Sequence, residues 1–209
     1  MARATLVMGR SGSGKSASLR NVEGDWLLIN VTNKPLPFKT KDNIKVVYTD
    51  DYLKIKSVLA KAYEKGIKSA VIDDAGYLLT GKFMAGHRGK AGGAQFDLYN
   101  EIADNYYYLI RFVCDELPED MNVYITMHED KNDFGESKPK TIGKLLDDKV
   151  CIEGLFTIVL HALKVDGKYV FATNSNGLDV TKSPMGMFET DYVENDLQLV
   201  DNAIREYYK

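Results

Sequence analysis

The chain has 209 residues, 44% hydrophobic and 27% charged, which predicts one soluble domain over residues 1–209 with a sizeable core. Its net charge of −3 excludes a global basic field, so any nucleic-acid binding must come from local patches. No apolar run approaches the roughly 20 residues of a membrane helix, and the N-terminus lacks a secretory pattern. With only Cys114 and Cys151, we expect a cytoplasmic protein without a membrane partner.

Short β-rich runs alternate with longer helical patterns along the chain. Seven runs are typical of strands: Ala4–Met8, Trp26–Val31, Ile44–Tyr48, Ser69–Ile72, Val123–Met127, Leu155–Leu163 and Tyr169–Ala172. Continuous rather than alternating apolar character favours strands buried on both faces of a parallel sheet. The last two runs, joined by Asp166-Gly167, predict an antiparallel hairpin added to that sheet.

Apolar residues at helical spacing predict three helices. These are a helix between Asp51 as cap and Gly66 as stop, one from about Phe96 to Leu117, and one from about Asp196 onward. Strands that alternate with helices indicate an α/β fold with three layers around a mostly parallel, twisted sheet.

Two segments fit neither pattern. Thr80–Ala94 is rich in glycine and cations, and Asp130–Thr141 is polar with one proline. Long structureless stretches in a compact domain are usually functional or disordered, so both segments are candidates for function.

The most specific motif is G-x-x-x-x-G-K-[ST], the P-loop, which GRSGSGKS matches at residues 9–16. Glycines let backbone N–H groups converge on phosphates, and a helix expected over Ala17–Asn21 would add its partial positive charge. Lys15 would reach the β- and γ-phosphates, and the Ser16 hydroxyl would coordinate Mg²⁺. The pattern thus predicts an ATP or ADP site with Mg²⁺. The expected contacts are Gly9, Arg10, Ser11, Gly12, Ser13, Gly14, Lys15, Ser16 and Ala17.

Polar residues end two of the buried runs. Asp73, after Ser69–Ile72, would hold Mg²⁺ through water. Asp74 would orient or deprotonate the attacking water, or simply cap the following turn. His128 would sense the γ-phosphate unless it is structural, and Glu129 rivals Asp74 as the catalytic base.

Other P-loop classes lack their signatures. GTPases need N-K-x-D, and Asn33–Leu36 lacks the aspartate and comes too early. There is neither an LSGGQ-like signature nor the arginine-rich lid of nucleoside kinases.

Eight segments carry a closer resemblance. They are GRSGSGKS at 9–16, NKPLPF at 33–38, VIDDAGYL at 71–78, VYITMHED at 123–130, KPKTIGKLLDDKV at 138–150, EGLFTIVLHAL at 153–163, TKSPMGMF at 181–188 and ENDL at 194–197. Their order resembles the RecA-like core. The combination is similar to the phage-encoded P-loop proteins grouped with the Sak-type single-strand annealing proteins, and it covers nearly the whole chain.

This resemblance implies an ATPase of a bacterial host's cytoplasm that binds single-stranded DNA and promotes annealing or strand pairing. It also implies self-assembly into a ring or filament, with a single-strand DNA-binding protein as a further partner. In RecA-like proteins two mobile loops face the DNA, which by order are Lys82–Gly93 and Lys131–Lys144 here. The expected DNA contacts are Lys82, Phe83, Arg88, Lys90, Lys131, Phe134, Lys138, Lys140 and Lys144.

The same resemblance places Lys182 where one subunit presents a cation to the nucleotide of the next, although a plain surface lysine is the alternative. The chain departs from RecA proteins in one respect. No acid follows Trp26–Val31, where they carry a catalytic glutamate, so Asp74 or Glu129 must replace it or hydrolysis is slow.

Three other functions stay open. An AAA-type motor or loader acting on a protein normally adds a helical lid, for which few residues remain after the last hairpin. A small-molecule P-loop kinase and a non-catalytic nucleotide switch share the phosphate motif with an ATPase.

Overall fold

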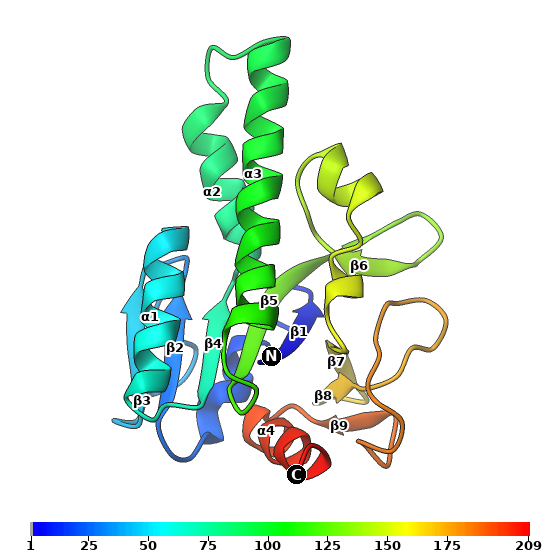
Figure 1. The fold of residues 1–209 in the computed structure, drawn as a ribbon. Helices are drawn as coiled ribbons and strands as arrows, with labels where there is room; N and C mark the ends of the chain where they lie inside the picture. Colours follow the sequence, from blue (N-terminus) through cyan, green and yellow to red (C-terminus); the bar gives the residue numbers. More distant parts are fainter. Residues whose placement is uncertain (1) are drawn as a thin grey trace.

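The computed structural model describes residues 2–209, which form one continuous sheet with helices on both faces (Figure 1). The strands are β1 (Arg3–Gly9), β2 (Trp26–Asn30), β3 (Ile44–Tyr48), β4 (Ser69–Asp73), β5 (Asn122–Lys131), β6 (Ser137–Pro139), β7 (Ile158–Val165), β8 (Lys168–Ala172) and β9 (Tyr192–Glu194). The α-helices are α1 (Tyr52–Glu64), α2 (Gly76–Gly86), α3 (Gly93–Arg111) and α4 (Leu197–Tyr207). None of the helices within residues 2–209 is long and apolar enough to cross a membrane.

The sheet has the order β3-β2-β4-β5-β1-β7-β8-β9, and β6 pairs only with β5. The six strands from β3 to β7 in this order are mutually parallel. β8 and β9 extend the sheet antiparallel, which confirms the predicted hairpin across Asp166-Gly167. The strand that leads into the P-loop, β1, and the strand that ends in Asp73, β4, have only β5 between them. A mostly parallel sheet with an antiparallel extension at one end is the sheet expected from the sequence.

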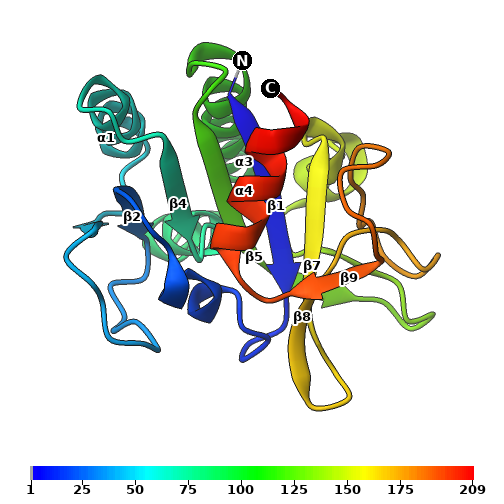
Figure 2. The ribbon, with the colours of Figure 1, turned by 90° about the horizontal axis from the view of Figure 1, so that it is seen from below.

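Two apolar cores hold helices against the sheet. Leu59 of α1, Leu79 of α2 and Ile102 of α3 are fully buried on one face. Leu19, before β2, and Val200 of α4 are buried on the other face. Figure 2 shows α4 crossing the face opposite α3. The three-layer α/β fold predicted from the sequence is therefore confirmed.

The predicted helix ends agree with the structure. Asp51 accepts a hydrogen bond from the backbone N–H of Lys54 (2.7 Å) at the start of α1. Asp196 does the same for Gln198 (2.9 Å) at the start of α4. The long helix continues beyond α3 as a π-helical turn over Phe112–Glu116, and ends before Pro118, which cannot continue it.

Two expectations about local structure need adjustment. The helix expected over Ala17–Asn21 is present, but as a six-residue 3-10 helix over Ser16–Asn21, which ends where Val22 is extended. It therefore lacks the long aligned dipole of an α-helix. The strand expected from Leu155 begins at Ile158, since Glu153–Leu155 forms a 3-10 turn.

The two segments that fit no pattern are largely ordered. Thr80–Gly86 completes α2, and residues 87–92 form a short turn before α3. Asp130 and Lys131 extend β5, which turns back at residues 132–136 into β6. Each segment is thus an ordered hairpin, one of helices and one of strands.

Candidate nucleotide-binding site

The P-loop lies at the carboxyl edge of the sheet, where β1 ends between β5 and β7. Gly9 pairs with His128 of β5, and Met8 pairs with His161 of β7. Gly14 has φ 99°, in the left-handed region that favours glycine. A Cβ there would also lie 2.8 Å from Oδ1 of Asn195, so both conformation and space require glycine.

The Lys15 side chain is buried beneath the P-loop and bonds the backbone of the loop's first residues. Its Nζ donates to the carbonyls of Gly9 (2.8 Å) and Arg10 (2.9 Å). Burial lowers the pKa of Lys15, while the nearby carboxylates of Asp74 and Asp73 oppose that shift. The ammonium is therefore positioned at the base of the phosphate cradle without a direct ion pair.

Ser16 and Asp73 meet at the centre of the site. The Ser16 Oγ lies 2.8 Å and 3.0 Å from the two carboxylate oxygens of Asp73. Thr126 of β5 donates a third hydrogen bond to Asp73 Oδ1 (2.8 Å). Burial raises the pKa of Asp73, and the hydrogen bonds from Thr126 and Ser16 only partly offset this.

These donors fit a magnesium ion. Mg²⁺ prefers oxygen ligands and is commonly held by one or two carboxylates together with substrate phosphates. The Ser16 hydroxyl and the Asp73 carboxylate are such ligands, and a bound cation would favour the charged form of Asp73. Among residues 2–209 no group of three or more His, Cys, Asp or Glu side chains could hold a metal by itself, so the phosphates would have to complete this set.

Asp74 has an unusual backbone conformation beside Asp73. Its φ is 58°, which aspartate tolerates better than most residues, and its N–H donates to Thr126 Oγ1 (2.8 Å). Its carboxylate lies 3.6 Å from Lys34 Nζ and 3.6 Å from His128 Nε2. The turn thus aims Asp74 toward two cation-capable side chains at the mouth of the site.

His128 lies between the P-loop and the first turn of α2. Its ring contacts Tyr77 edge to face, with centroids 5.8 Å apart. Burial lowers the pKa of His128, and the charge of Lys15 adds to this effect. A neutral imidazole at this place can donate or accept a hydrogen bond.

Glu129 is held by two partners. Its oxygens accept from Arg10 Nε (3.1 Å) and from His161 Nε2, and only 6% of its side chain is exposed. His161 bonds Asp179 through its other ring nitrogen (2.9 Å). The hydrogen bonds from His161 and Thr181 lower the pKa of Asp179, although its burial acts in the opposite direction. With both oxygens engaged, Glu129 is less free than Asp74 to accept a proton from water.

A cleft of about 720 Å³ surrounds the outer side of the P-loop. It is lined by Ser11, Gly12, Gly14, Lys15, Ser16, Ala17, Arg20, Lys34, Pro37, Asp74, Tyr77, His128, Tyr169 and Asn195. We call it the nucleotide cleft. The cleft residues that were not predicted as site residues are Arg20, Lys34, Pro37, Tyr77, Tyr169 and Asn195. Of these, Lys34, Pro37, Tyr77 and Asn195 lie in segments that carry the resemblance, but no role was assigned to them. A second cleft of about 570 Å³ shares Ser11, Tyr77 and His128 with it and adds Arg10, Gly76, Thr80, Glu129, Lys140 and Ile142.

The first predicted DNA segment forms the tip of the helical hairpin that α2 and α3 raise away from the sheet (Figure 1). Lys82 lies on α2 and pairs with Glu101 of α3 (2.8 Å). Phe83 is half-buried and stacks on His87 and Tyr99, and its contact with bases stays a prediction. Arg88 and Lys90 are exposed in the turn between the helices, and Phe96, 70% exposed, lies just beyond it.

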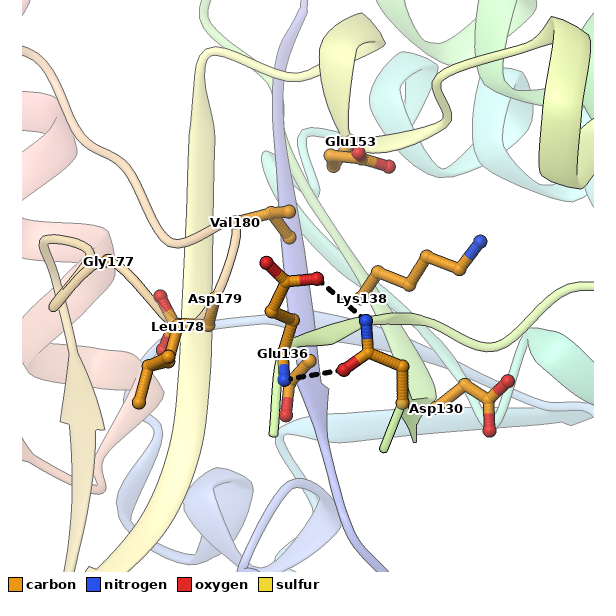
Figure 3. A pocket seen from close by; sticks show the side chains of 10 residues that line it. Asp130, Glu136, Lys138, Glu153, Gly177, Leu178, Asp179 and Val180 are labelled. Atoms are coloured by element: carbon orange, nitrogen blue, oxygen red, sulfur yellow. Dashed lines mark hydrogen bonds between the residues drawn. The ribbon is translucent and has the colours of Figure 1, made fainter. Parts of the chain in front are cut away.

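The second predicted segment has mixed charge. Lys131 and Phe134, 85% exposed, lie at the end of the β5–β6 hairpin. Lys138 lies 3.8 Å from Asp147 and projects beside a pocket of about 420 Å³ (Figure 3). The acidic residues of that pocket are Asp130, Glu136, Glu153 and Asp179. These carboxylates make this side of the hairpin unfavourable for nucleic-acid phosphates.

Three other predicted cations lie apart from this hairpin. Lys140 lines the second cleft, and Lys144 is exposed before the turn Leu145–Lys149. Lys182 pairs through its backbone with Val159 at the outer edge of β7 and does not line the nucleotide cleft of its own chain. Its contact with a neighbouring subunit stays a prediction.

Comparison with known proteins adds a distant likeness in fold. No protein-family model and no curated protein matches the chain. Among solved structures, it is similar to a KaiC-like protein of the hyperthermophilic archaeon Pyrococcus horikoshii OT3, with 12% identity and a TM-score of 0.44. The match covers 81% of this chain and 76% of that one. A likeness of this size carries no argument about function, so what the site does must be argued from its own residues.

Proposed function

We propose that this chain binds Mg-ATP in the nucleotide cleft and hydrolyses it as an ATPase coupled to single-stranded DNA. The observation that carries the proposal is the contact between the Ser16 hydroxyl and the Asp73 carboxylate beside a buried Lys15. A glycine turn without a binding role would not be expected to bring a hydroxyl, a carboxylate and an ammonium together beneath it. Mg-nucleotide binding needs all three groups.

The chain's own residues have distinct parts in this reaction. Lys15 exchanges its contacts with the carbonyls of Gly9 and Arg10 for phosphate oxygens. Ser16 and Asp73 hold Mg²⁺, which neutralises charge on the phosphates. Asp74 orients the attacking water and accepts its proton, and Lys34 Nζ lies 3.6 Å from that carboxylate. His128 senses whether a γ-phosphate is bound.

The helical tip supports the DNA part of the proposal. Arg88 and Lys90 are exposed there without a nearby acid in the turn, and Phe96 offers an aromatic face for a base. α2 begins three residues after Asp73, so the tip is connected to the metal site through one helix. We infer that strand annealing or pairing in a phage-infected bacterial cytoplasm is the process served. The active form would be a ring or filament with Lys182 reaching the next subunit, and a single-strand DNA-binding protein would assist.

An ATPase assay with and without single-stranded DNA tests this proposal. We expect slow release of phosphate that DNA accelerates, and DNA affinity that falls steeply as salt increases, because bound counterions are released. If single-stranded DNA neither binds nor changes ATP turnover over a salt series, the DNA part is wrong. If Mg-ATP does not bind, the whole proposal is wrong.

The second cleft favours one other candidate, a small-molecule kinase. It shares His128 and Tyr77 with the nucleotide cleft, and its Lys140, with Arg10 beside Glu129, would suit an anionic acceptor. ADP and inorganic phosphate should appear in equal amounts if the chain is an ATPase. Formation of ADP without inorganic phosphate, in the presence of a small-molecule acceptor, would favour the kinase.

A further inference from the structure

Asn195 is a buried amide without a partner beside the P-loop. It follows β9, is 1% exposed, and neither Oδ1 nor Nδ2 has a hydrogen-bond partner within residues 2–209. Its amide lies next to Gly14, where an added Cβ would be 2.8 Å from Oδ1 and 3.1 Å from Nδ2. Buried amides are nearly always paired, and leaving one unpaired costs free energy, so this one calls for an explanation.

Asn195 and Tyr169 lie on one face of the sheet. Tyr169 and Phe171 share a face of β8 because side chains alternate along a strand. Phe171 pairs with Val193, and Asn195 stands two residues further along the same face. Phe171 packs with Leu19, so this is the face that carries the 3-10 helix after the P-loop.

Arg20 links Asn195 to Ala17, the residue that follows the P-loop motif. Its Nη1 donates to the carbonyl of Asn195 (2.7 Å) and to that of Ala17 (3.2 Å). The backbone N–H of Asn195 donates in turn to the carbonyl of Tyr169 (3.3 Å). Tyr169, Asn195 and Ala17 therefore stand around one corner of the nucleotide cleft.

The direction of a bound nucleotide follows from the P-loop itself. The β- and γ-phosphates belong near Lys15 and Ser16, facing Asp74 and His128. The α-phosphate and the nucleoside must then extend to the other side, past Ala17. That side is lined by Arg20, Tyr169 and Asn195.

We propose that Tyr169 and Asn195 form the nucleoside-binding half of the nucleotide cleft. The Tyr169 ring, 46% exposed, stacks on the base, and the Asn195 amide, one donor group and one acceptor, hydrogen-bonds the nucleoside. This inference rests on the proposed function, since it adds nucleoside recognition to a phosphate site.

The test compares a whole nucleotide with its phosphates alone. Calorimetry with Mg²⁺ measures binding of the non-hydrolysable analogue AMP-PNP and of inorganic tripolyphosphate to the same protein. We expect the wild type to bind AMP-PNP more tightly, and Tyr169→Ala to reduce that preference about tenfold or more. Tripolyphosphate affinity should not change. Tyr192→Ala is the matched control, because Tyr192 is also 46% exposed but lies on the opposite face of β9.

Asn195→Leu tests the amide, since leucine has a similar branched shape but cannot hydrogen-bond. We expect an AMP-PNP affinity about tenfold lower, with tripolyphosphate affinity kept. Because the wild-type amide has no partner within residues 2–209, the nucleotide-free variant should melt no lower than the wild type. A variant that melts lower and loses both ligands equally would show that the amide supports the P-loop, which overturns its assigned role.

The wild-type results separate the two proposals. If neither AMP-PNP nor tripolyphosphate binds, both the proposed function and this inference are wrong. If both bind with equal affinity, the phosphate site stands and the nucleoside site is refuted.

Discussion

The Ser16 hydroxyl lies 2.8 Å from a carboxylate oxygen of Asp73, although 57 residues separate them in the chain. β1 and β4 bring them together by ending at the same edge of the sheet with β5 between them. The contact brings together a hydroxyl and a carboxylate, the two oxygen groups that would hold Mg²⁺ beside the phosphates.

Replacing Asp73 by asparagine should remove the dependence of nucleotide binding on Mg²⁺. Asparagine keeps the shape but is a weak metal ligand, and we expect Mg-ATP affinity to fall about 10- to 100-fold. Titration with ATP, with and without Mg²⁺, measures the effect. Equal dependence on Mg²⁺ in the two proteins would remove Asp73 from the metal site.

Asp73→Asn should also change how the free energy of unfolding depends on pH. Burial raises the pKa of Asp73 in the folded protein, so folding favours its neutral form. The free energy of unfolding of the metal-free wild type should therefore decrease as pH rises through that pKa, since the folded state binds more protons than the unfolded one. Asp73→Asn should lack this decrease, which urea unfolding at a series of pH values above 4 would reveal.

Lys15→Ala should abolish tight ATP binding while the fold persists. Loss of a charge-assisted contact with phosphate costs about 3 kcal/mol, or about 100-fold in affinity. Among the described residues the Lys15 ammonium bonds only the carbonyls of Gly9 and Arg10, which can bond water instead, so circular dichroism should be unchanged. Lys41→Ala, at an exposed lysine that does not line the cleft, is the control. Normal turnover in Lys15→Ala would refute the P-loop assignment.

The phosphate motif and the strand-ending Asp73 could be predicted because each depends on local sequence. The P-loop glycines are fixed by conformations that few other residues adopt, and an acid after an apolar strand faces the sheet edge. The three-layer fold followed in the same way from alternating strand and helix patterns. Local patterns therefore located the phosphate half of the site.

The partners of Glu129 could not be predicted from local patterns. They depend on β7 lying beside β1, which brings His161 within reach, and only the tertiary fold shows this. His161 was visible only as a polar residue in an apolar strand. Asn195 follows β9, a strand of three residues that is too short for any periodic pattern. The stacking of Phe83 on Tyr99 likewise depends on α2 lying beside α3.

The α2–α3 tip should carry more of the DNA affinity than other cationic surfaces. We expect Arg88→Glu with Lys90→Glu to weaken single-stranded DNA binding and to reduce the salt slope by about 0.7 for each lost phosphate contact. ATP affinity without DNA should not change, because neither residue lines the nucleotide cleft. Fluorescence anisotropy over a salt series measures the slope.

The control for this pair makes the same charge change elsewhere. Lys45→Glu with Lys65→Glu alters two exposed lysines near the far edge of the sheet. If both double variants lose the same affinity, only net charge matters and the tip is not the DNA surface.

Asp201 should be essential for stability because α4 is held to the sheet through it. It is 3% exposed and accepts hydrogen bonds from Ser69, Asn122, Tyr124 and Arg205. Asp201→Ala would leave several buried donors and a charge unpaired, so we expect a loss of about 3–5 kcal/mol in the free energy of unfolding. Urea unfolding measures this loss. Glu206→Ala, at an exposed acid of the same helix, should change stability by less than about 0.5 kcal/mol.

The identity of the catalytic base can be decided between Asp74 and Glu129. Asp74 is aimed at the mouth of the nucleotide cleft, whereas both oxygens of Glu129 are engaged by Arg10 and His161. We expect Asp74→Asn to lower the turnover of bound ATP about 100-fold or more, as loss of a general base does. Glu129→Gln should cause a smaller loss, because an amide can still accept a hydrogen bond and the cleft is otherwise intact.

Single-turnover hydrolysis at saturating Mg-ATP separates these effects from changes in affinity. The reverse order of losses would make Glu129 the base, and its bond with His161 would then be the means of holding it in place. Equal, small losses in both variants would mean that water attacks without a general base. Slow hydrolysis would then follow directly from the absence of an acid after β2.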